Sequence, residues 1–448
     1  MDKDNHVSRR KFMQVGGALV AGTAAVASGQ PEPAEEKQSS VIKRYRTLGR
    51  TGFKVSDIGL GAGPLKEVNV LRYIYDKGVN YFDTAESYTQ GQSEKTIGEA
   101  MRFMDRKKIF VTTKIHVDEN DSKENIVDRF SACQERLKTN YVDALYIWGV
   151  SRVDELKNPA FHSVAEQLKA DGRIKHIGIS CHGPRWSGGD TMEAVCTAAA
   201  EDGRFDLMLF VYSFMNREAA ENVLAVCKKN NVGTTAMKVA PGVFEQPEVF
   251  DAENLNEDQE KYIERMKGRG TERDEAIERL RNWNKDEIEA WENTKPFIEQ
   301  YKITSAAQLK KTSIQWVLNN PDMHTVCVSM NDFDAIDTYT ALSGTTLSRA
   351  ENRYLNRYAQ AHSRLYCRHA CKECLAACPN GVPISTIMRY ATYYRTGRQK
   401  DAMVKYSKLG TRQAKACLTC DAPCQVKCPY GVPVQASLIR ADRMLTLV

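Results

Sequence analysis

From Tyr45 onward, short apolar runs alternate with segments whose apolar residues recur at helical spacing. Eight of these runs are typical of β-strands, and a helical pattern follows each of them. Eight strand–helix units joined by short loops predict an α/β fold, a closed parallel (β/α)8 barrel and not an open doubly wound sheet. The predicted strands are Val55–Gly61, Tyr81–Thr84, Ile109–Lys114, Ala144–Trp148, His176–Ser180, Leu207–Tyr212, Thr234–Lys238 and Val326–Met330.

One segment interrupts this alternation. Residues 250–300, between the seventh strand and its helix, are rich in charge and poor in aliphatic side chains. We expect an inserted surface segment that is helical from Asp274 to Glu292. Because the loops of barrels carry specificity, the insert is expected either to lie over the catalytic face or to be a solvated excursion. The clearest helical patterns elsewhere are Glu94–Met104, Lys123–Leu137, Ser163–Ala170 and Asp332–Leu342.

Length and composition set the class of protein. The chain has 448 residues, of which 42% are hydrophobic and 27% charged, which indicates a globular protein with more than one domain. Its longest apolar run, from Val15 to Ser28, is shorter than the roughly 18 residues that cross a bilayer. An integral membrane protein is therefore excluded.

The N-terminus has the pattern of a targeting signal. Ser8-Arg9-Arg10-Lys11-Phe12-Met13 precedes a weakly apolar stretch and then the small residues Ala25-Val26-Ala27. This order resembles a twin-arginine translocation signal, with a short basic helix as the alternative. We predict a signal peptide over residues 1–30, a linker over 31–42, and export to the periplasm or the outer face of the cytoplasmic membrane.

Polar residues at strand ends suggest the chemistry. Asp83 and Lys114 end the second and third predicted strands, Tyr88 follows closely, and barrel enzymes carry their reacting groups at these ends. An ammonium group beside a tyrosine favours phenolate and lowers the pKa of the phenol, while a carboxylate holds the ammonium in place. We expect Tyr88 to exchange a proton with a substrate oxygen, as carbonyl reduction by hydride transfer requires.

The region from Tyr45 to Leu342 is similar to the aldo/keto reductase family. The most specific motif is Asn80-Tyr81-Phe82-Asp83-Thr84-Ala85-Glu86-Ser87-Tyr88. The resemblance covers about two-thirds of the chain, taken here as a barrel domain over residues 43–348, and implies an oxidoreductase. The other matching segments are Tyr45–Gly52, Val55–Gly61, Ser93–Gly98, Thr112–Lys114 and Ile177–Ser180.

The resemblance also implies roles for single residues. Tyr88 is then the general acid/base, Lys114 its pKa partner and Asp83 the residue that orients Lys114. Trp148 stands where the family usually has a histidine, and an indole donates a hydrogen bond but carries no transferable proton at neutral pH. His116 and His182 either substitute for that histidine or are structural.

The nucleotide implied by the resemblance is NADP(H). Ser180 is expected near the nicotinamide amide, and Ser329 and Asn331, in the loop after the last strand, near the phosphate of the adenosine. The tyrosine that commonly stacks on nicotinamide is replaced by Met237 and Lys238. Since soluble nicotinamide pools are cytoplasmic, an exported protein either carries the cofactor out in bound form or uses another electron donor.

The last hundred residues contain two cysteine runs. Each run has closely spaced thiols and ends in Cys-Pro, which is typical of loops that bind iron–sulfur clusters. The flanking sequences repeat, since Pro379-Asn380-Gly381-Val382-Pro383 is echoed by Pro429-Tyr430-Gly431-Val432-Pro433. We predict a small, mostly α-helical, ferredoxin-like domain over residues 349–448 with two 4Fe-4S clusters. Their ligands are Cys367, Cys371, Cys374, Cys378, Cys417, Cys420, Cys424 and Cys428.

The spacing does not fix the partition of these ligands, since each run has one residue more than the common bacterial pattern. In two-cluster ferredoxins the last cysteine of each run serves the other cluster. Our working hypothesis places Cys428 with the first three cysteines of the first run, and Cys378 with the first three of the second. Structural zinc and disulfides are the alternatives. The other five cysteines, scattered through the barrel, are interpreted as small core residues.

Charge is concentrated in the same region. The formal net charge is +6, but the residues from Asn352 onward include 16 Lys or Arg and only 4 Asp or Glu. Such a basic surface suits an acidic redox partner or peripheral contact with a membrane, and no nucleic-acid recognition motif accompanies it.

The sequence therefore predicts an exported oxidoreductase that acts on a carbonyl/alcohol pair of a small molecule with NADP(H) and electron-transfer clusters. The alternative is a catalytically altered barrel that serves as an electron-transfer or binding module, and Trp148 is the residue that favours it.

Overall fold

The computed structural model describes residues 40–240, 249–255, 257–268, 270–292, 295–300 and 306–446. The predicted signal peptide and all but residues 40–42 of the predicted linker lie outside these ranges. Within them, no helix combines the length and the apolar character needed to span a membrane.

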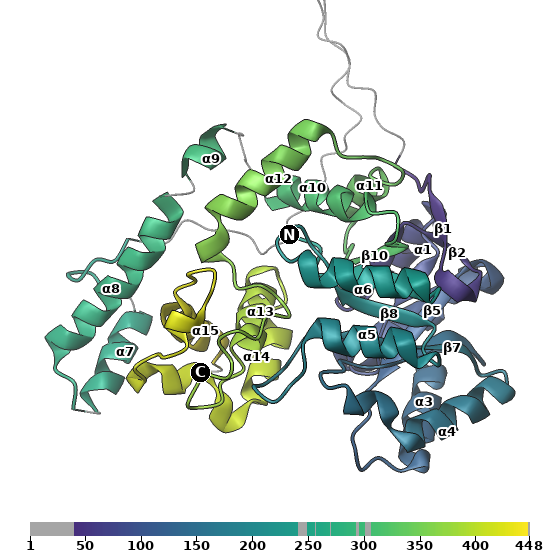
Figure 1. Cartoon of the computed structure of the whole chain (residues 1–448), viewed down its shortest axis with the longest axis horizontal. Coiled ribbons are helices and arrows are strands. Elements are labelled where there is room, and N and C mark those ends of the chain that lie inside the picture. The colour runs from purple at the N-terminus through teal and green to yellow at the C-terminus, as the bar shows by residue number, and fades with distance from the viewer. Residues whose placement is uncertain are drawn as a thin grey trace, which may run out of the picture. The chain divides into compact units, whose positions relative to one another are not determined.

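A closed barrel of eight parallel strands forms the larger part of the described fold, which confirms the predicted architecture (Figure 1). Hydrogen bonds join the strands in the order β10-β3-β4-β5-β6-β7-β8-β9, so the first and last strands close the barrel. The strands are β3 (Ile58–Gly61), β4 (Tyr81–Asp83), β5 (Phe110–Ile115), β6 (Val142–Ile147), β7 (Ile174–Cys181), β8 (Leu207–Val211), β9 (Gly233–Met237) and β10 (Thr325–Val328).

The first predicted strand is in fact two strands. Residues 55–61 divide at the buried Asp57, and β2 (Lys54–Ser56) pairs in antiparallel fashion with β1 (Tyr45–Thr47) outside the barrel. The carboxylate of Asp57 accepts hydrogen bonds from Ser343 Oγ (2.6 Å) and Gly344 N (3.0 Å). A periodic apolar run does not reveal this break, because the partners of Asp57 are far away in sequence.

Helices surround the barrel as the sequence predicts. The helix predicted over Lys123–Leu137 has those bounds, and Ser122 Oγ caps it by accepting from Asn125 N. The helix predicted from Ser163 begins earlier, at Pro159, because Asn158 caps it and proline suits the first turn. These outer helices are α1 (Val68–Asp76), α2 (Gln92–Ala100), α3 (Lys123–Leu137), α4 (Pro159–Ala170), α5 (Met192–Asp202), α6 (Glu218–Lys229), α10 (Ala306–Leu318) and α11 (Phe333–Thr340).

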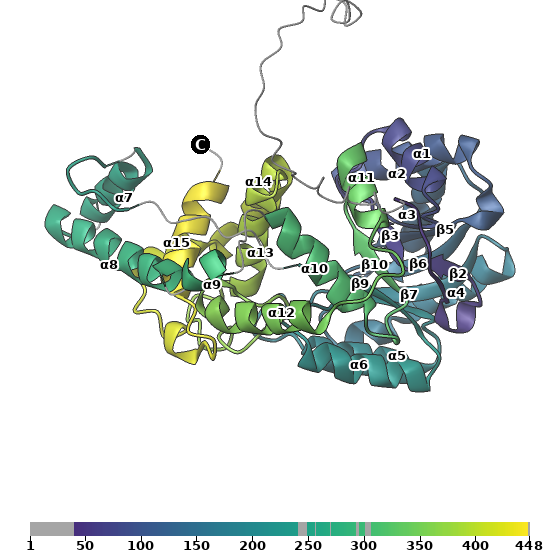
Figure 2. The ribbon, with the colours of Figure 1, turned by 90° about the horizontal axis from the view of Figure 1, so that it is seen from above.

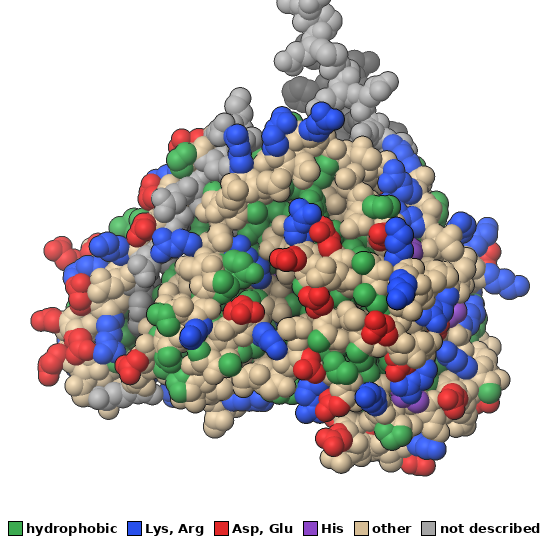
Figure 3. All heavy atoms as spheres, viewed as in Figure 1, with side chains coloured by type: hydrophobic (Ala, Val, Ile, Leu, Met, Phe, Trp, Pro, Cys, Tyr) green, Lys and Arg blue, Asp and Glu red, His purple; other side chains and the backbone are tan. Residues whose placement is uncertain are grey.

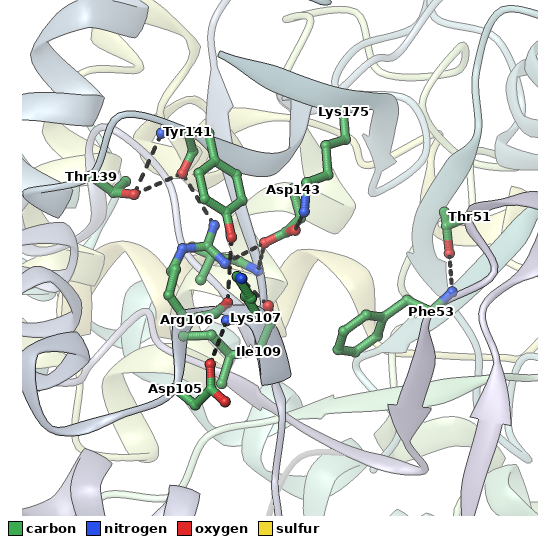
Figure 4. A network of polar contacts seen from close by, with 11 residues as sticks. Thr51, Phe53, Asp105, Arg106, Lys107, Ile109, Thr139, Tyr141, Asp143 and Lys175 are labelled. Carbon is green, nitrogen blue, oxygen red and sulfur yellow. Dashed lines mark hydrogen bonds and ion pairs between the residues drawn. The ribbon is translucent and has the colours of Figure 1, made fainter. Parts of the chain in front are cut away.

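A buried carboxylate joins three strands where they begin, at the amino end of the barrel (Figure 4). Asp143, on β6, accepts from Arg106 (2.7 Å), from the Val111 amide on β5 (3.0 Å) and from Lys175 on β7 (2.9 Å). Arg106 also lies over the ring of Tyr141, with 4.0 Å between its Cζ and the ring centroid. This network lies at the end opposite the catalytic face, where barrels keep stabilising contacts.

The C-terminal part is helical, and its elements are α12 (Arg349–Ala361), α13 (Ile384–Arg395), α14 (Gln399–Ser407) and α15 (Val434–Leu445). Both ribbon views place α13 and α14 between the barrel and α15 (Figures 1 and 2). We refer to residues 366–446 as the cysteine module. Its apolar core is separate from that of the barrel and includes Leu375, Ile387 and Leu438.

The insert packs on the cysteine module. It forms α7 (Glu257–Lys267), α8 (Arg273–Glu292) and α9 (Lys295–Gln300), so the predicted helix is present as α8. The side chains of Ile263 and Leu280 are part of the apolar core of the module. Arg265 forms an ion pair with Asp442, with 3.6 Å between Nη1 and Oδ2. The outer face of the insert carries both acidic and basic side chains (Figure 3). Among them, Arg273 and Glu260 form an ion pair with 2.9 Å between Nη2 and Oε1.

The expectation that the insert covers the catalytic face is therefore not met by its described residues. Their apolar side chains are used against the module, and none of them lines the cavity at the barrel mouth.

Candidate active site

A cavity of about 490 Å³ lies at the carboxyl ends of the barrel strands. Gly61 ends β3, Met237 ends β9, and Trp148 and Ser329 follow β6 and β10; all four line the cavity. Tyr88 lines it as well, from the turn after β4. The opposite wall comes from α13, α14 and the turn after them, so the cavity is enclosed by two parts of the chain.

Asp83, Lys114 and Tyr88 come together at this cavity. Lys114 is fully buried, and its Nζ donates to Asp83 Oδ2 (2.6 Å) and to the Thr84 carbonyl oxygen (2.6 Å). Asp83 also accepts from Thr112 Oγ1 (2.8 Å). Lys114 Nζ lies 4.9 Å from the centroid of the Tyr88 ring. The parallel register of β4 and β5 brings these side chains to the same end of the barrel.

The protonation of Tyr88 differs from the expectation. Desolvation raises its pKa to about 12, and the opposing effect of Lys114 is smaller. Burial alone would lower the pKa of Lys114, but Asp83 holds it above its ordinary value. The expected acidic phenol is thus wrong for this structure, because desolvation outweighs the effect of Lys114, and the charge of Asp83 further raises the pKa of Tyr88. Tyr88 is a proton donor at neutral pH.

Trp148 contacts both Tyr88 and His116. Its ring meets Tyr88 edge-on, with 5.6 Å between centroids, and stacks on His116 at 4.4 Å. All three side chains line the same cavity. Burial, and then Arg185, lower the pKa of His116 to about 4, so this imidazole is neutral near pH 7.

His182 also lines the cavity, from the loop after β7. Burial and the charges of Arg389 and Lys238 lower its pKa well below the usual value. Its Nδ1 is buried and has no hydrogen-bond partner among the described residues. Both histidines considered as substitutes therefore lie at the cavity, where each is a neutral ring.

The residues predicted to bind the nucleotide do not share one environment. Ser180 is buried behind the cavity wall, where its Oγ accepts from Gly149 N at 2.9 Å. Ser329 lines the cavity and donates to the Gly61 carbonyl oxygen at 3.2 Å. Asn331 is exposed and is not part of the lining.

Several lining residues were not predicted from the sequence. Lys238 follows β9, and the cysteine module adds two tyrosines, Tyr390 and Tyr393, and five basic side chains. Burial alone would raise the pKa of Tyr393, but Lys238, Arg389 and Arg398 lower it to about 7. The excess of basic residues near the C-terminus was the available signal, but it does not say where they lie. The basic lining residues of the module are Arg389, Arg398, Lys405, Lys408 and Arg412.

The eight module cysteines are free thiols in this structure. Burial raises the pKa of Cys367, as do Cys374, Cys371 and Cys428. Burial raises that of Cys417 to about 12, and Cys378, Cys424 and Cys420 add to the effect. Cys374 is also influenced by Cys424, so the two sets adjoin. Among the described residues, no three His, Cys, Asp or Glu side chains form a site for a single metal ion.

Comparison with known proteins gives a family match over the barrel. Residues 61–359 of the chain match the profile described as "Aldo/keto reductase family". Among curated proteins, the chain is 26% identical over 204 residues to a probable aldo-keto reductase 1 of Glycine max, which covers 42% of this chain and 56% of that protein. It is 36% identical over 119 residues to a probable voltage-gated potassium channel subunit beta of Arabidopsis thaliana, covering 23% and 36%. The chain thus spans less than two-thirds of either relative.

Solved structures also resemble it. An aldo-keto reductase of Bacillus halodurans in its holo form has 19% identity and a TM-score of 0.49, with 71% of this chain and 97% of that chain covered. An aldo-keto reductase of Klebsiella pneumoniae in complex with NADPH has 18% identity and a TM-score of 0.46, covering 71% and 96%.

Proposed function

Because this chain belongs to the aldo/keto reductase family, we propose that it is an oxidoreductase that interconverts the carbonyl and alcohol forms of a small molecule at Tyr88. The observation that supports this proposal most directly is the arrangement of Tyr88, Lys114 and Asp83 at the edge of the cavity. A phenol that keeps its proton at neutral pH suits the reduction of a carbonyl group.

The chain's own residues handle the proton. Tyr88 donates it to the carbonyl oxygen during reduction, and in the reverse direction the phenolate takes it back. The ammonium group of Lys114 stabilises that phenolate, and Asp83 fixes the position of Lys114 by a hydrogen bond of 2.6 Å. Trp148 and His116 form the cavity wall around the carbonyl group, since both rings line the cavity. Both rings are uncharged near pH 7.

We propose NADP(H) as the cofactor, which supplies hydride to the carbonyl carbon when it is bound. The lining fits such a group, because Lys238, which follows β9, is a donor that suits phosphate oxygens. Ser329 adds a hydroxyl group on the β10 side. Ser180 acts from behind the wall, where it holds the Gly149 backbone in place. Asn331 stays a predicted contact.

Replacing the phenol tests the reaction. Tyr88→Phe removes the proton donor, so the turnover of generic aldehydes with NADPH is expected to fall about 10²- to 10⁴-fold, with NADPH binding retained. Tyr394→Phe is the matched control, since Tyr394 lies on α13 outside the cavity. Fluorescence quenching measures binding, and NADPH consumption measures turnover. If the wild type neither binds micromolar NADPH nor turns over aldehydes, the altered-barrel alternative, which Trp148 favours, is the better description.

We further propose that the cysteine module carries two 4Fe-4S clusters. The mutual influence of the thiols supports the crossed partition, with Cys428 beside the first run and Cys378 beside the second. In a four-iron cluster each thiolate binds a different iron, so its sulfurs lie further apart than the ligands of one ion. The basic surroundings of the module offset the anionic clusters.

Iron content tests the clusters. Purified under anaerobic conditions, the protein is expected to contain about eight irons per chain and to give electron paramagnetic resonance signals of reduced four-iron clusters. Under the crossed partition, Cys428→Ser impairs the cluster of the first run and Cys378→Ser that of the second. Cys196→Ser, in the barrel, is the control. Zinc in place of iron, or pairing of the cysteines in disulfides, would contradict the proposal.

The place of action is also proposed. Ser8 to Met13 and the segment after them support export by the twin-arginine route to the periplasm or the outer face of the cytoplasmic membrane. There the clusters would exchange single electrons with an acidic redox partner or a protein at the membrane surface. Residues 1–35 fused to a folded reporter should send it to the periplasm, and Arg9→Lys with Arg10→Lys should keep it in the cytoplasm.

A further inference from the structure

The cysteine module forms one wall of the catalytic cavity. Its first cysteine loop packs against the loops after β7 and β8. Asn216, which follows β8, donates from Nδ2 to the His369 carbonyl oxygen at 2.6 Å. A methyl group added to Gly183 would lie 2.5 Å from the Cα of Ala370, so the two backbones are in close contact. Contacts of this kind place α13 and α14 across from Tyr88.

This wall is basic, and the cavity lining is of one sign. Arg185 and Lys238 come from the barrel, the module adds five basic side chains, and no Asp or Glu of the described residues lines the cavity. Among the described residues, Asp401 is the carboxylate that pairs with them, and it binds Arg398 (2.6 Å) and Lys405 (2.5 Å). The remaining five basic groups are in no ion pair within the part of the chain that the structure describes.

Some of this donor capacity is unused inside the protein. The Nε of Arg389 is buried and has no hydrogen-bond partner in the described ranges. Lys238 Nζ and Arg398 Cζ lie 4.8 and 4.4 Å from the ring centroid of Tyr393, so charges from the barrel and the module converge on one ring. Like charges held in a cavity with low-dielectric walls repel each other, and an anion that enters relieves this repulsion.

We propose that the cysteine module is the substrate-recognition wall of the barrel, and that the substrate carries an anionic carboxylate or phosphate group beside its reactive carbonyl. The inference rests on the proposed function for the reaction at Tyr88, and it adds the class of substrate. Arg389, Lys408 and Arg412 bind the anionic group, while the carbonyl oxygen reaches Tyr88 across the same cavity.

Two matched pairs of small molecules test the inference in the full-length holoprotein. Binding is measured by calorimetry with benzoate and its neutral counterpart benzamide, which needs no turnover. Reduction is measured with 4-carboxybenzaldehyde and its methyl ester, which differ in charge at the same position of the ring. We expect each anion to be preferred at least about tenfold, and Lys408→Gln with Arg412→Gln to remove the preference. Lys400→Gln, an exposed residue of α14 outside the cavity, is the control and should leave it unchanged.

The outcomes separate the two proposals. Selective benzoate binding without any aldehyde turnover supports the recognition wall and contradicts the proposed reaction. Turnover with equal kcat/KM for acid and ester, unaffected by the double substitution, overturns the recognition wall and leaves the reaction standing. Loss of benzoate binding when NADPH is added would overturn the inference too, because the basic groups would then serve the phosphates of the nucleotide.

Discussion

Tyr393 is a lining residue whose charge changes close to neutral pH. Lys238, Arg389 and Arg398 lower its pKa to about 7, against the effect of burial. Lys405 and Tyr88 also lie near the Tyr393 ring. Asp401 partly neutralises the charges of Arg398 and Lys405. The phenol is neutral below pH 7, and above it the phenolate reduces the positive charge of the cavity.

Anion binding is therefore expected to weaken as the pH rises through about 7. One added negative charge in a partly solvated cavity corresponds to roughly 1 kcal/mol, or about fivefold in the dissociation constant of benzoate. Tyr393→Phe should remove this dependence, whereas Tyr390→Phe, another lining phenol, should keep it. Calorimetry between pH 6 and 9 is the measurement, and a dependence that persists in Tyr393→Phe would assign the titration to another group.

The sequence predicts some of these residues and not others. Asp83, Lys114 and Tyr88 could be found because they stand at strand ends within one stretch of the chain. Tyr393 and Lys238 could not, since they meet only when the module packs on the barrel mouth. The direction of the pKa of Tyr88 was also missed, because it depends on desolvation, which spacing along the chain does not reveal.

At the level of elements, Asp143 connects β5, β6 and β7 at the amino end of the barrel (Figure 4). Asp143→Asn removes a buried negative charge and leaves Arg106 without its ion-pair partner. We expect a loss of about 3 kcal/mol in the free energy of unfolding, with the chemistry at the opposite end retained. Denaturant unfolding measures it. Asp128→Asn, exposed on α3, should change stability by less than about 0.5 kcal/mol, and equal losses in both variants would contradict this role.

The elements themselves were largely predictable from the sequence. The eight barrel strands follow from their apolar runs, and α3 and α8 follow from helical spacing. The division of the first strand at Asp57 and the packing of the insert on the module were not predictable. Both depend on partners that are distant in sequence, such as Ser343 for Asp57 and the module core for Leu280.

For the whole molecule, the contact between Gly183 and Ala370 is one of the close contacts between the module and the barrel. Gly183 has φ +80°, and an added methyl group would lie 2.5 Å from the Ala370 Cα. Gly183→Ala is expected to push the module away from the barrel mouth and to weaken benzoate binding at least about tenfold, as loss of the basic wall requires.

Gly172→Ala is the matched control. It imposes the same kind of backbone strain at φ +69°, but no atom lies within 4 Å of the added methyl group. It should lose only about 1–2 kcal/mol of stability and keep benzoate binding. Equal binding by both alanine variants would show that the close contact does not position the wall.

The position of α13 and α14 also decides how such an enzyme would be inactivated. Every group that handles the proton belongs to the barrel, yet much of the chamber around it belongs to a small fold with its own core. Should that fold be held together by iron and sulfide, as proposed, exposure to oxygen would stop catalysis without altering a single atom of Tyr88, Lys114 or Asp83. Sensitivity to air would then arise from the walls of the reaction chamber and not from its chemistry.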